Sequence, residues 1–248
     1  MKIKQLAYLL TLAAPLTANA DFLSISAGGG AWNESPSGNF QKVTDPIAVD
    51  VENDLFWDSE SQAYAFIAFE HFVPIVPNVR LLYTKIDHDG SGNATFNFDG
   101  QPFDGIVTND IEIETTDLIL YYEVLDNVVS LDLGLNIRSL KADYTITGDD
   151  GSGGISTTTD SIDEVVPMLY AAVGASPWPE LLISGELSYV AFDGSSVSDF
   201  TAKVAYTTNF LLGFEAGYRK QNFEFDDVSD TDADLDFDGV FAGAYLKF

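Results

Sequence analysis

Ionised side chains recur within segments of this chain that otherwise alternate between apolar and polar residues. In "LGFEAGYR", Glu215 and Arg219 share the face opposite Phe214 and Tyr218. If the apolar faces of such segments meet lipid, the charged groups lie away from bulk water and must be paired. The pattern predicts an interior network of ion pairs and hydrogen bonds, formed by Glu70, Arg80, Asp117, Glu123, Asp132, Arg138, Glu186, Lys203, Glu215 and Arg219.

Two predicted turns bring members of this network face to face. A hairpin centred on Ile75 places Glu70 opposite Arg80, and a hairpin centred on Asn209 places Lys203 opposite Glu215. Residues directly opposite on neighbouring strands are close enough to interact. The network is either a polar plug that fills the interior or a gated path for cations, and the small strand number derived below favours the plug.

The segment "DHDGSGN" resembles the start of a calcium-binding loop. Asp87, Asp89, Ser91 and Gly92 match positions one, three, five and six of an EF-hand loop, which supply oxygen ligands and a tight turn. Position twelve is Phe98 instead of the bidentate glutamate, and no helices are predicted beside the segment. A flexible acidic turn is therefore favoured over a calcium site at Asp87, Asp89 and Ser91.

A run of aspartates occurs in "DDVSDTDADLDFDG", at residues 226–239. Such a block of like charge is typical of a solvated surface. Carboxylates and phosphates both bind magnesium and calcium, so loosely held divalent ions could bridge this run to the phosphates of lipopolysaccharide. No other cofactor is expected.

Catalysis commonly needs a general base, and histidine is the usual one. The predicted strands and loops contain two histidines, His71 and His88. His88 lies between Asp87 and Asp89, but the sequence places no serine nucleophile beside this group. We therefore expect no enzymatic activity, and an enzyme at the rim of the fold is the alternative that would depend on His88.

The elements that position these residues follow from the same alternation. In "VVSLDLGLNIR", Val129, Leu131 and Leu133 fall on one face, and Ser130 and Asp132 fall on the other. Period-two alternation of this kind indicates β-strands. It predicts ten strands, near residues 21–33, 61–72, 78–88, 110–125, 127–147, 160–175, 180–192, 198–208, 210–226 and 237–248.

The connections between these strands alternate in length. Short turns such as "LDN" and "TNF" follow the even-numbered strands, and longer polar links such as "DGSGNATFNFDGQPFDGIVTN" follow most of the odd-numbered ones. An even strand number with short turns at one end and long loops at the other is typical of outer-membrane barrels with periplasmic termini. We predict an all-β fold, a ten-stranded antiparallel up-and-down transmembrane β-barrel.

Both ends of the chain fit export to the outer membrane of a Gram-negative cell. Residues 1–20 combine Lys2 and Lys4 with an apolar stretch and a small-residue site ending at Ala20, which predicts a cleaved secretory signal and one barrel domain over residues 21–248. In the last strand, Leu246 and Phe248 belong to the predicted lipid-facing row. A final strand ending in Phe also resembles the signal recognised by the barrel assembly machinery.

The charge excludes one class of partner. The formal net charge is −28, and it becomes −30 when two of the eleven basic residues leave with the predicted signal. Nucleic-acid binding needs clustered bases, so it is not expected. All three arginines fall on polar faces within strands. The alternative fold, a soluble exported β-barrel or β-sandwich, would scatter its bases over exposed loops.

Three stretches resemble a known family. "FEHFVPIVPNVRL" (69–81), "GYRKQNFEFDD" (217–227) and "FDGVFAGAYLKF" (237–248) are similar to the proteobacterial proteins labelled "outer membrane protein with GlyGly". The resemblance covers essentially the whole mature chain and implies an outer-membrane β-barrel of undetermined biochemical role. It brings no catalytic residues.

These observations predict an outer-membrane barrel with a structural or surface role, acidic external loops and a plugged polar lumen. Its expected partners are outer-membrane lipids, lipopolysaccharide and the barrel assembly machinery. A small gated cation-preferring channel, similar to a porin in principle, is the first alternative, and an enzyme at the rim is the second.

Overall fold

Alternating side chains extend over most of the chain, and the segments that carry them form long antiparallel strands. The structure is a computed structural model that describes residues 23–248, so the predicted signal, residues 1–20, lies outside the described residues. The strands are β1 (Leu23–Lys42), β2 (Val49–Asp50), β3 (Glu60–His71), β4 (Asn78–Phe98), β5 (Gln101–Asp126), β6 (Val129–Asp149), β7 (Ile155–Trp178), β8 (Leu181–Phe192), β9 (Ser195–Thr207), β10 (Leu212–Val228) and β11 (Thr231–Lys247).

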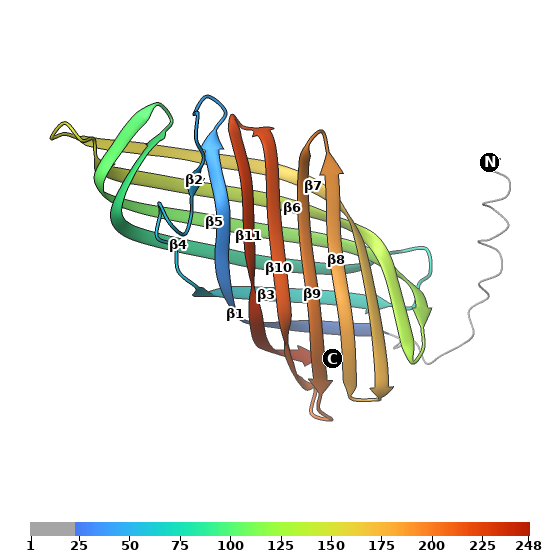
Figure 1. Cartoon of the computed structure of the whole chain (residues 1–248). Helices are drawn as coiled ribbons and strands as arrows, with labels where there is room; N and C mark the ends of the chain where they lie inside the picture. Colours follow the sequence, from blue (N-terminus) through green and yellow to red (C-terminus); the bar gives the residue numbers. More distant parts are fainter. Residues whose placement is uncertain (1–22) are drawn as a thin grey trace, which may run out of the picture.

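The strands close into a ring. Each long strand pairs with its neighbour in sequence, and β11 pairs with β1 over the register from Ser26↔Lys247 to Lys42↔Thr231. The two-residue strand β2 pairs with β1 and adds no member to the ring. The predicted ten-stranded up-and-down barrel is therefore confirmed. In Figure 1, β8–β11 cross in front of the long strands β4–β7.

The lower end of the barrel is defined here as the end where β1 begins and β11 finishes. Short turns join the strands there, as predicted, at residues 72–77, 127–128, 179–180 and 208–211. At the upper end, most of the predicted long loops are wrong. Strands β4 and β5 continue to a turn at Asp99 and Gly100, and β10 and β11 continue to a turn at Ser229 and Asp230.

Partway up each long strand, the apolar side chains change from the outward face to the inward face. This change explains the error. On β6, Leu135 and Ile137 point outward and are exposed, while Arg138 points inward. Higher on the same strand the outward residue is Lys141, and the inward residue Leu140 is buried. The upper half is therefore polar outside and apolar inside, so its outward Asp, Asn, Ser and Thr residues imitate loop composition.

The lower half carries a continuous band of exposed apolar side chains, named here the apolar belt. It occupies about nine residues of a strand such as β6, which matches the length of a tilted transmembrane strand. The belt consists of the outward side chains of residues 23–31, 63–69, 79–83, 118–124, 129–137, 165–173, 183–189, 200–206, 212–218 and 240–246.

No helix within residues 23–248 is long and apolar enough to cross a membrane.

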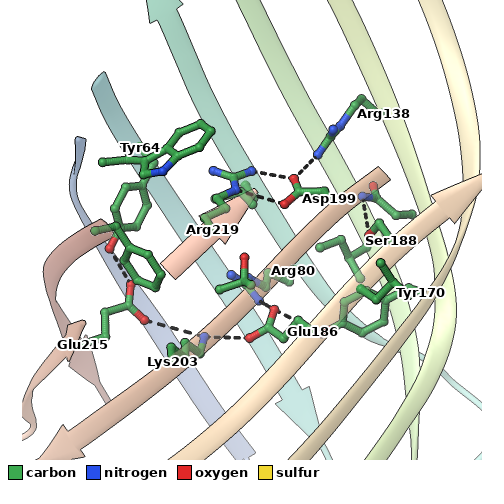
Figure 2. A pocket seen from close by; sticks show the side chains of 17 residues that line it. Tyr64, Arg80, Arg138, Tyr170, Glu186, Ser188, Asp199, Lys203, Glu215 and Arg219 are labelled. Carbon is green, nitrogen blue, oxygen red and sulfur yellow. Dashed lines mark hydrogen bonds and ion pairs between the residues drawn. The ribbon is translucent and has the colours of Figure 1, made fainter. Parts of the chain in front are cut away.

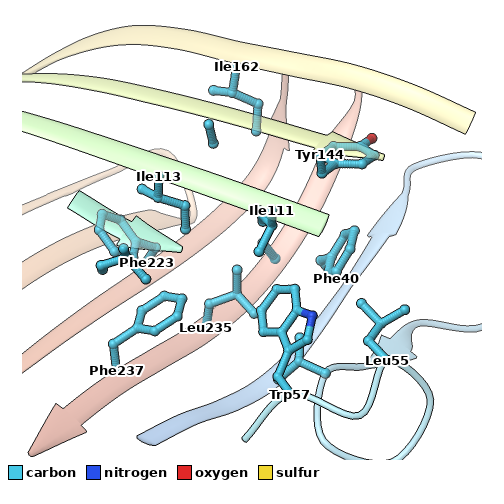
Figure 3. Packing of buried hydrophobic residues seen from close by; sticks show 14 of the residues in the cluster. Phe40, Leu55, Trp57, Ile111, Ile113, Tyr144, Ile162, Phe223, Leu235 and Phe237 are labelled. Atoms are coloured by element: carbon cyan, nitrogen blue, oxygen red, sulfur yellow. The ribbon is translucent and has the colours of Figure 1, made fainter. Parts of the chain in front are cut away.

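The upper half has an apolar core inside the ring (Figure 3). Phe40 of β1 packs against Trp57, Phe98 and Tyr144, with ring centroids 5.2 to 6.4 Å apart. Burial of this apolar surface stabilises the part of the barrel that stands above the belt. Its interior therefore resembles that of a soluble domain, although the ring of strands is continuous with the lower half.

Residues 43–59, named here the cap segment, fold into this upper core. The segment is fastened by backbone and side-chain hydrogen bonds: Val51 N donates to Gly38 O at 3.0 Å, and Asn109 Nδ2 donates to Leu55 O at 2.8 Å. The Trp57 indole donates to Asn109 Oδ1 at 2.6 Å. A connection predicted as an external loop therefore closes the upper interior.

Two glycines of "DHDGSGN" make room for the cap segment. A Cβ on Gly90 would lie 1.8 Å from the backbone oxygen of Leu55, and a Cβ on Gly92 would lie 2.3 Å from the Phe56 ring. The whole motif lies within β4 and not in a loop.

The flexible acidic turn predicted at Asp87, Asp89 and Ser91 is wrong, because these residues lie within β4. These side chains point outward from one face of an extended strand, and each is about 7 Å from the next along the strand. They therefore cannot surround one ion. Within residues 23–248, no group of three or more acidic or histidine side chains is placed to hold a metal ion.

We predict that Gly90→Ala displaces the cap segment, because its new methyl group meets backbone that cannot rotate away. The expected loss is about 1 to 3 kcal/mol of the free energy of unfolding, measured by urea unfolding of the refolded barrel. Gly185→Ala is the matched control, since no atom lies within 4 Å of its added Cβ. Equal stability of the two variants would contradict the packing described for the cap segment.

Candidate functional site

The inward side chains of the lower half form two groups of ion pairs in the lumen (Figure 2). The first, the Asp199 cluster, is centred on β9. Asp199 accepts hydrogen bonds from Arg138 at 2.5 Å, from Arg219 at 2.7 and 3.0 Å and from Gln221 at 2.8 Å. One carboxylate thus joins two guanidinium groups from β6 and β10.

Each arginine of the Asp199 cluster is held on a second side. Arg138 donates to both oxygens of Asp117, at 2.7 and 3.0 Å, in the two-point geometry that suits a guanidinium. Arg219 donates to Thr84 Oγ1 at 2.9 Å, and its guanidinium lies 5.1 Å from the centre of the Trp32 ring. Such a position over an aromatic face is attractive for a cation.

The second group, the Glu186 cluster, lies closer to the lower end. Glu186 accepts from Arg80 at 2.5 Å and from Lys203 at 2.8 Å, and the Lys203 ammonium also lies 3.6 Å from Glu215. The Tyr64 hydroxyl donates to Glu215 at 2.8 Å. These residues come from β3, β4, β8, β9 and β10, so the contacts extend across the interior.

The two clusters are electrically balanced. Asp117 and Asp199 face Arg138 and Arg219, while Glu186 and Glu215 face Arg80 and Lys203. The side chains of both clusters are at most 16% exposed. Buried charges are tolerated when each has a partner of opposite sign, so these two clusters need no added ion for neutrality.

Seven of the ten residues predicted for the lumen network lie in these clusters. The other three lie nearer the lower opening, where Glu70 accepts from the Tyr121 hydroxyl at 2.9 Å and Glu123 accepts from Asn78 at 3.2 Å. Asp132 lines a cavity at that end. The seven are Arg80, Asp117, Arg138, Glu186, Lys203, Glu215 and Arg219.

The predicted pairing of Glu70 with Arg80 is wrong. Arg80 lies opposite Ala68, since the turn is centred one residue away from Ile75, and it pairs across the lumen with Glu186.

The predicted register of Lys203 with Glu215 is also wrong, because the turn is centred one residue away from Asn209. Lys203 lies opposite Gly217, and Glu215 lies opposite Ala205. The two charged groups still meet, as diagonal neighbours.

Sequence reasoning missed Asp199, the acceptor at the centre of the first cluster. Asp199 lies on the same inward face of β9 as Thr201 and Lys203, so the alternation of the sequence could have identified it. Tyr121 also lies in the interior, since it is buried and its hydroxyl donates to Glu70.

The open space of the lumen is unevenly divided. A cavity of about 340 Å³ lies at the lower end, lined by Glu70, Asp132, Tyr121 and the Glu186 cluster. Between the two clusters the remaining cavity is only about 40 Å³, enough for a few water molecules. Above it, the apolar core and the cap segment occupy the interior.

His88, on which the enzyme alternative would depend, lies within β4 and not on a loop. The imidazole is fully buried, with Nε2 2.8 Å from Glu34 Oε1, and it is stacked between Trp57 and Phe237. His71 lies at the lower end of β3. Neither histidine stands at the upper rim, where the enzyme alternative needs a base.

The aspartate run was predicted to be an external link, and most of it is strand instead. Asp234, Asp236 and Asp238 point outward from the upper half of β11, where Lys220 lies 3.0 Å from Asp236. In the β6–β7 turn, Asp150 accepts backbone hydrogen bonds from Gly154 and Ser152 at 2.8 Å. These donors lower the pKa of the Asp150 carboxyl.

Comparison with known proteins identifies the fold. No protein-family model and no curated protein matches the sequence. The outer membrane protease OmpT from Escherichia coli aligns with a TM-score of 0.61 at 10% identity, covering 94% of this chain and 99% of that chain. Ail of Yersinia pestis aligns with a TM-score of 0.39 at 9% identity, covering 91% of this chain and 98% of that chain.

The likeness to OmpT shows a shared fold, that of an outer-membrane β-barrel. At 10% identity it says nothing about activity.

We predict that Asp199→Asn destabilises the barrel by about 3 to 5 kcal/mol, because it leaves two buried guanidinium groups with too few negative partners. Urea unfolding measures the change. Asp163→Asn is the matched control, since its pair with Lys141 is exposed and 3.9 Å long and should contribute less than about 1 kcal/mol. A loss at Asp199 no larger than the control loss would show that the cluster is not a structural centre.

Proposed function

We propose that this protein resides in the outer membrane as a closed barrel with a structural or surface role and no catalytic activity. The main support for this proposal is that side chains fill the interior in both the lower and the upper half of the barrel. The balanced ion clusters occupy the lower half, and the apolar core with the cap segment occupies the upper half. This filling supports the interpretation of the polar residues as a plug that interrupts any aqueous path through the barrel.

The outer surface supports the proposed lipid partners. The apolar belt suits acyl chains, and the outward carboxylates of the upper half suit divalent ions that bridge to lipopolysaccharide phosphates. Loosely bound calcium or magnesium is thus proposed along the upper wall, and not at the Asp87–Ser91 motif.

The end of the chain supports recognition by the barrel assembly machinery. Phe248 is tied into the closing seam, since its N–H donates to Ile25 O at 2.8 Å and Ile25 N donates to Phe248 O at 3.0 Å. Leu246 lies in the apolar belt of the same strand. We also propose membership of the family labelled "outer membrane protein with GlyGly", on the three sequence stretches given above.

A small cation-preferring channel is the second candidate. The lower cavity favours it, because Glu70 and Asp132 line that cavity together with the charge-balanced Glu186 cluster. The cavity ends below the Asp199 cluster, so conduction would require the interior above it to open.

We predict that the refolded mature protein gives no ion conductance in a planar bilayer. The double variant Arg80→Ala, Glu186→Ala removes a matched pair from the lower cluster and should stay silent, because the upper core still closes the lumen. Folding is verified for both proteins by the shift in electrophoretic mobility on heating. Reproducible channels from the unaltered protein, changed in the double variant, would replace the closed barrel with the channel.

A further inference from the structure

Three lysines lie on the outward surface, and all three stand just above the apolar belt. On β4, Lys85 follows Tyr83 on the outward face, and on β10, Lys220 follows Tyr218. Lys141 of β6 lies in the same cross-strand row as Lys85. They are named here the collar lysines. The other basic residues within residues 23–248 are buried or half-buried in the interior or lie at the lower end: Lys42, Arg80, Arg138, Lys203, Arg219 and Lys247.

The outward surface changes character with height. One outward position above Lys85, the row on β4, β5 and β6 contains Asp87, Glu112 and Asp143, and the next row contains Asp89 and Asp110. The row of Lys85 and Lys141 also contains Glu114 and Asp163, and Lys220 lies opposite Asp238, so this level carries both signs of charge. The order from the belt upward is therefore apolar, then mixed in charge, then acidic. A lipid phosphate is fixed directly above its acyl chains, so it meets the level that contains the lysines and not the acidic wall.

The collar lysines remain available for a ligand. Lys85 lies 2.5 Å from Glu112 and 3.1 Å from Asp87, and Lys220 lies 3.0 Å from Asp236. The side chains of Lys85 and Lys220 are nevertheless 35% and 42% exposed, and that of Lys141 is 55% exposed. Interior Lys203 is 13% exposed. An ammonium has three donors, so even the two carboxylate partners of Lys85 leave one donor free. Such exposed ion pairs add little to stability, so folding alone does not account for three lysines at one level.

We propose that the collar lysines bind the phosphate groups of a phosphorylated glycolipid in the outer leaflet. This deepens the proposed function and rests on it, because it requires the apolar belt to lie in the membrane. The lysines bind phosphate directly, whereas the carboxylates above them can reach phosphate only through a divalent ion. The acidic wall then sets the height of binding, since a phosphate raised above the collar meets negative charge.

The test compares lipid retention by the full mature barrel in phosphatidylcholine vesicles that contain either bis-phosphorylated lipid A or its dephosphorylated form. Native mass spectrometry counts the retained glycolipid after extraction into detergent, with EDTA present to remove divalent ions. The triple variant Lys85→Gln, Lys141→Gln, Lys220→Gln removes the collar charge. The matched triple variant to Arg keeps the charge, and Lys247→Gln removes a lysine at the lower end.

The unaltered protein should retain the phosphorylated form preferentially, and the glutamine variant should lose about five-fold in affinity per lysine removed. The arginine variant and Lys247→Gln should retain the preference. A preference that survives in the glutamine variant, or one that disappears in EDTA for the unaltered protein, would overturn the proposal. Conductance is read separately, so a barrel that conducts would refute the closed lumen without changing the retention result.

Discussion

Charge neutrality in a confined interior is the constraint on which the lower half of this barrel depends. Alternation places the polar face of every strand inside whenever the outer face must meet lipid. A ring of only ten strands leaves little water in that space. The ionised groups must therefore neutralise one another, and Asp199 between Arg138 and Arg219 is the clearest case. The contacts across the lumen follow from this requirement and connect strands that do not pair.

The same reasoning shows why the fold could be predicted and the upper half could not. Ring closure, strand number and the short lower turns follow from period two, which is unaffected by which face is apolar. The upper ends of the strands were not predicted, because the outward residues change from apolar to polar there. On β6 this change occurs between Ile137 and Lys141. Above that level an outward "DGSGN" is part of a solvated strand, yet its composition is that of a turn.

The site could be predicted only in part, for a different physical reason. The alternation of side chains along each strand assigned the lumen residues to the interior, because it requires only local sequence. Predicting which residues meet across the lumen requires the relative shift of all ten strands, which the local sequence does not give. Arg80 was therefore paired with Glu70 on its own hairpin and not with distant Glu186. The role of Gly90 was equally hidden, because its reason is the backbone of Leu55, which comes from another segment.

The two halves of the lumen are filled by different kinds of interaction. Ion pairing in the lower half depends on matched charges and is disturbed when one partner is removed. Packing in the upper half depends on apolar area and on the fit of the cap segment, which Gly90 and Trp57 secure. The two halves meet at Tyr64 and Trp32, which belong to the apolar core and also contact Glu215 and Arg219 of the ion clusters. These two aromatic side chains connect the apolar packing to the ion pairs.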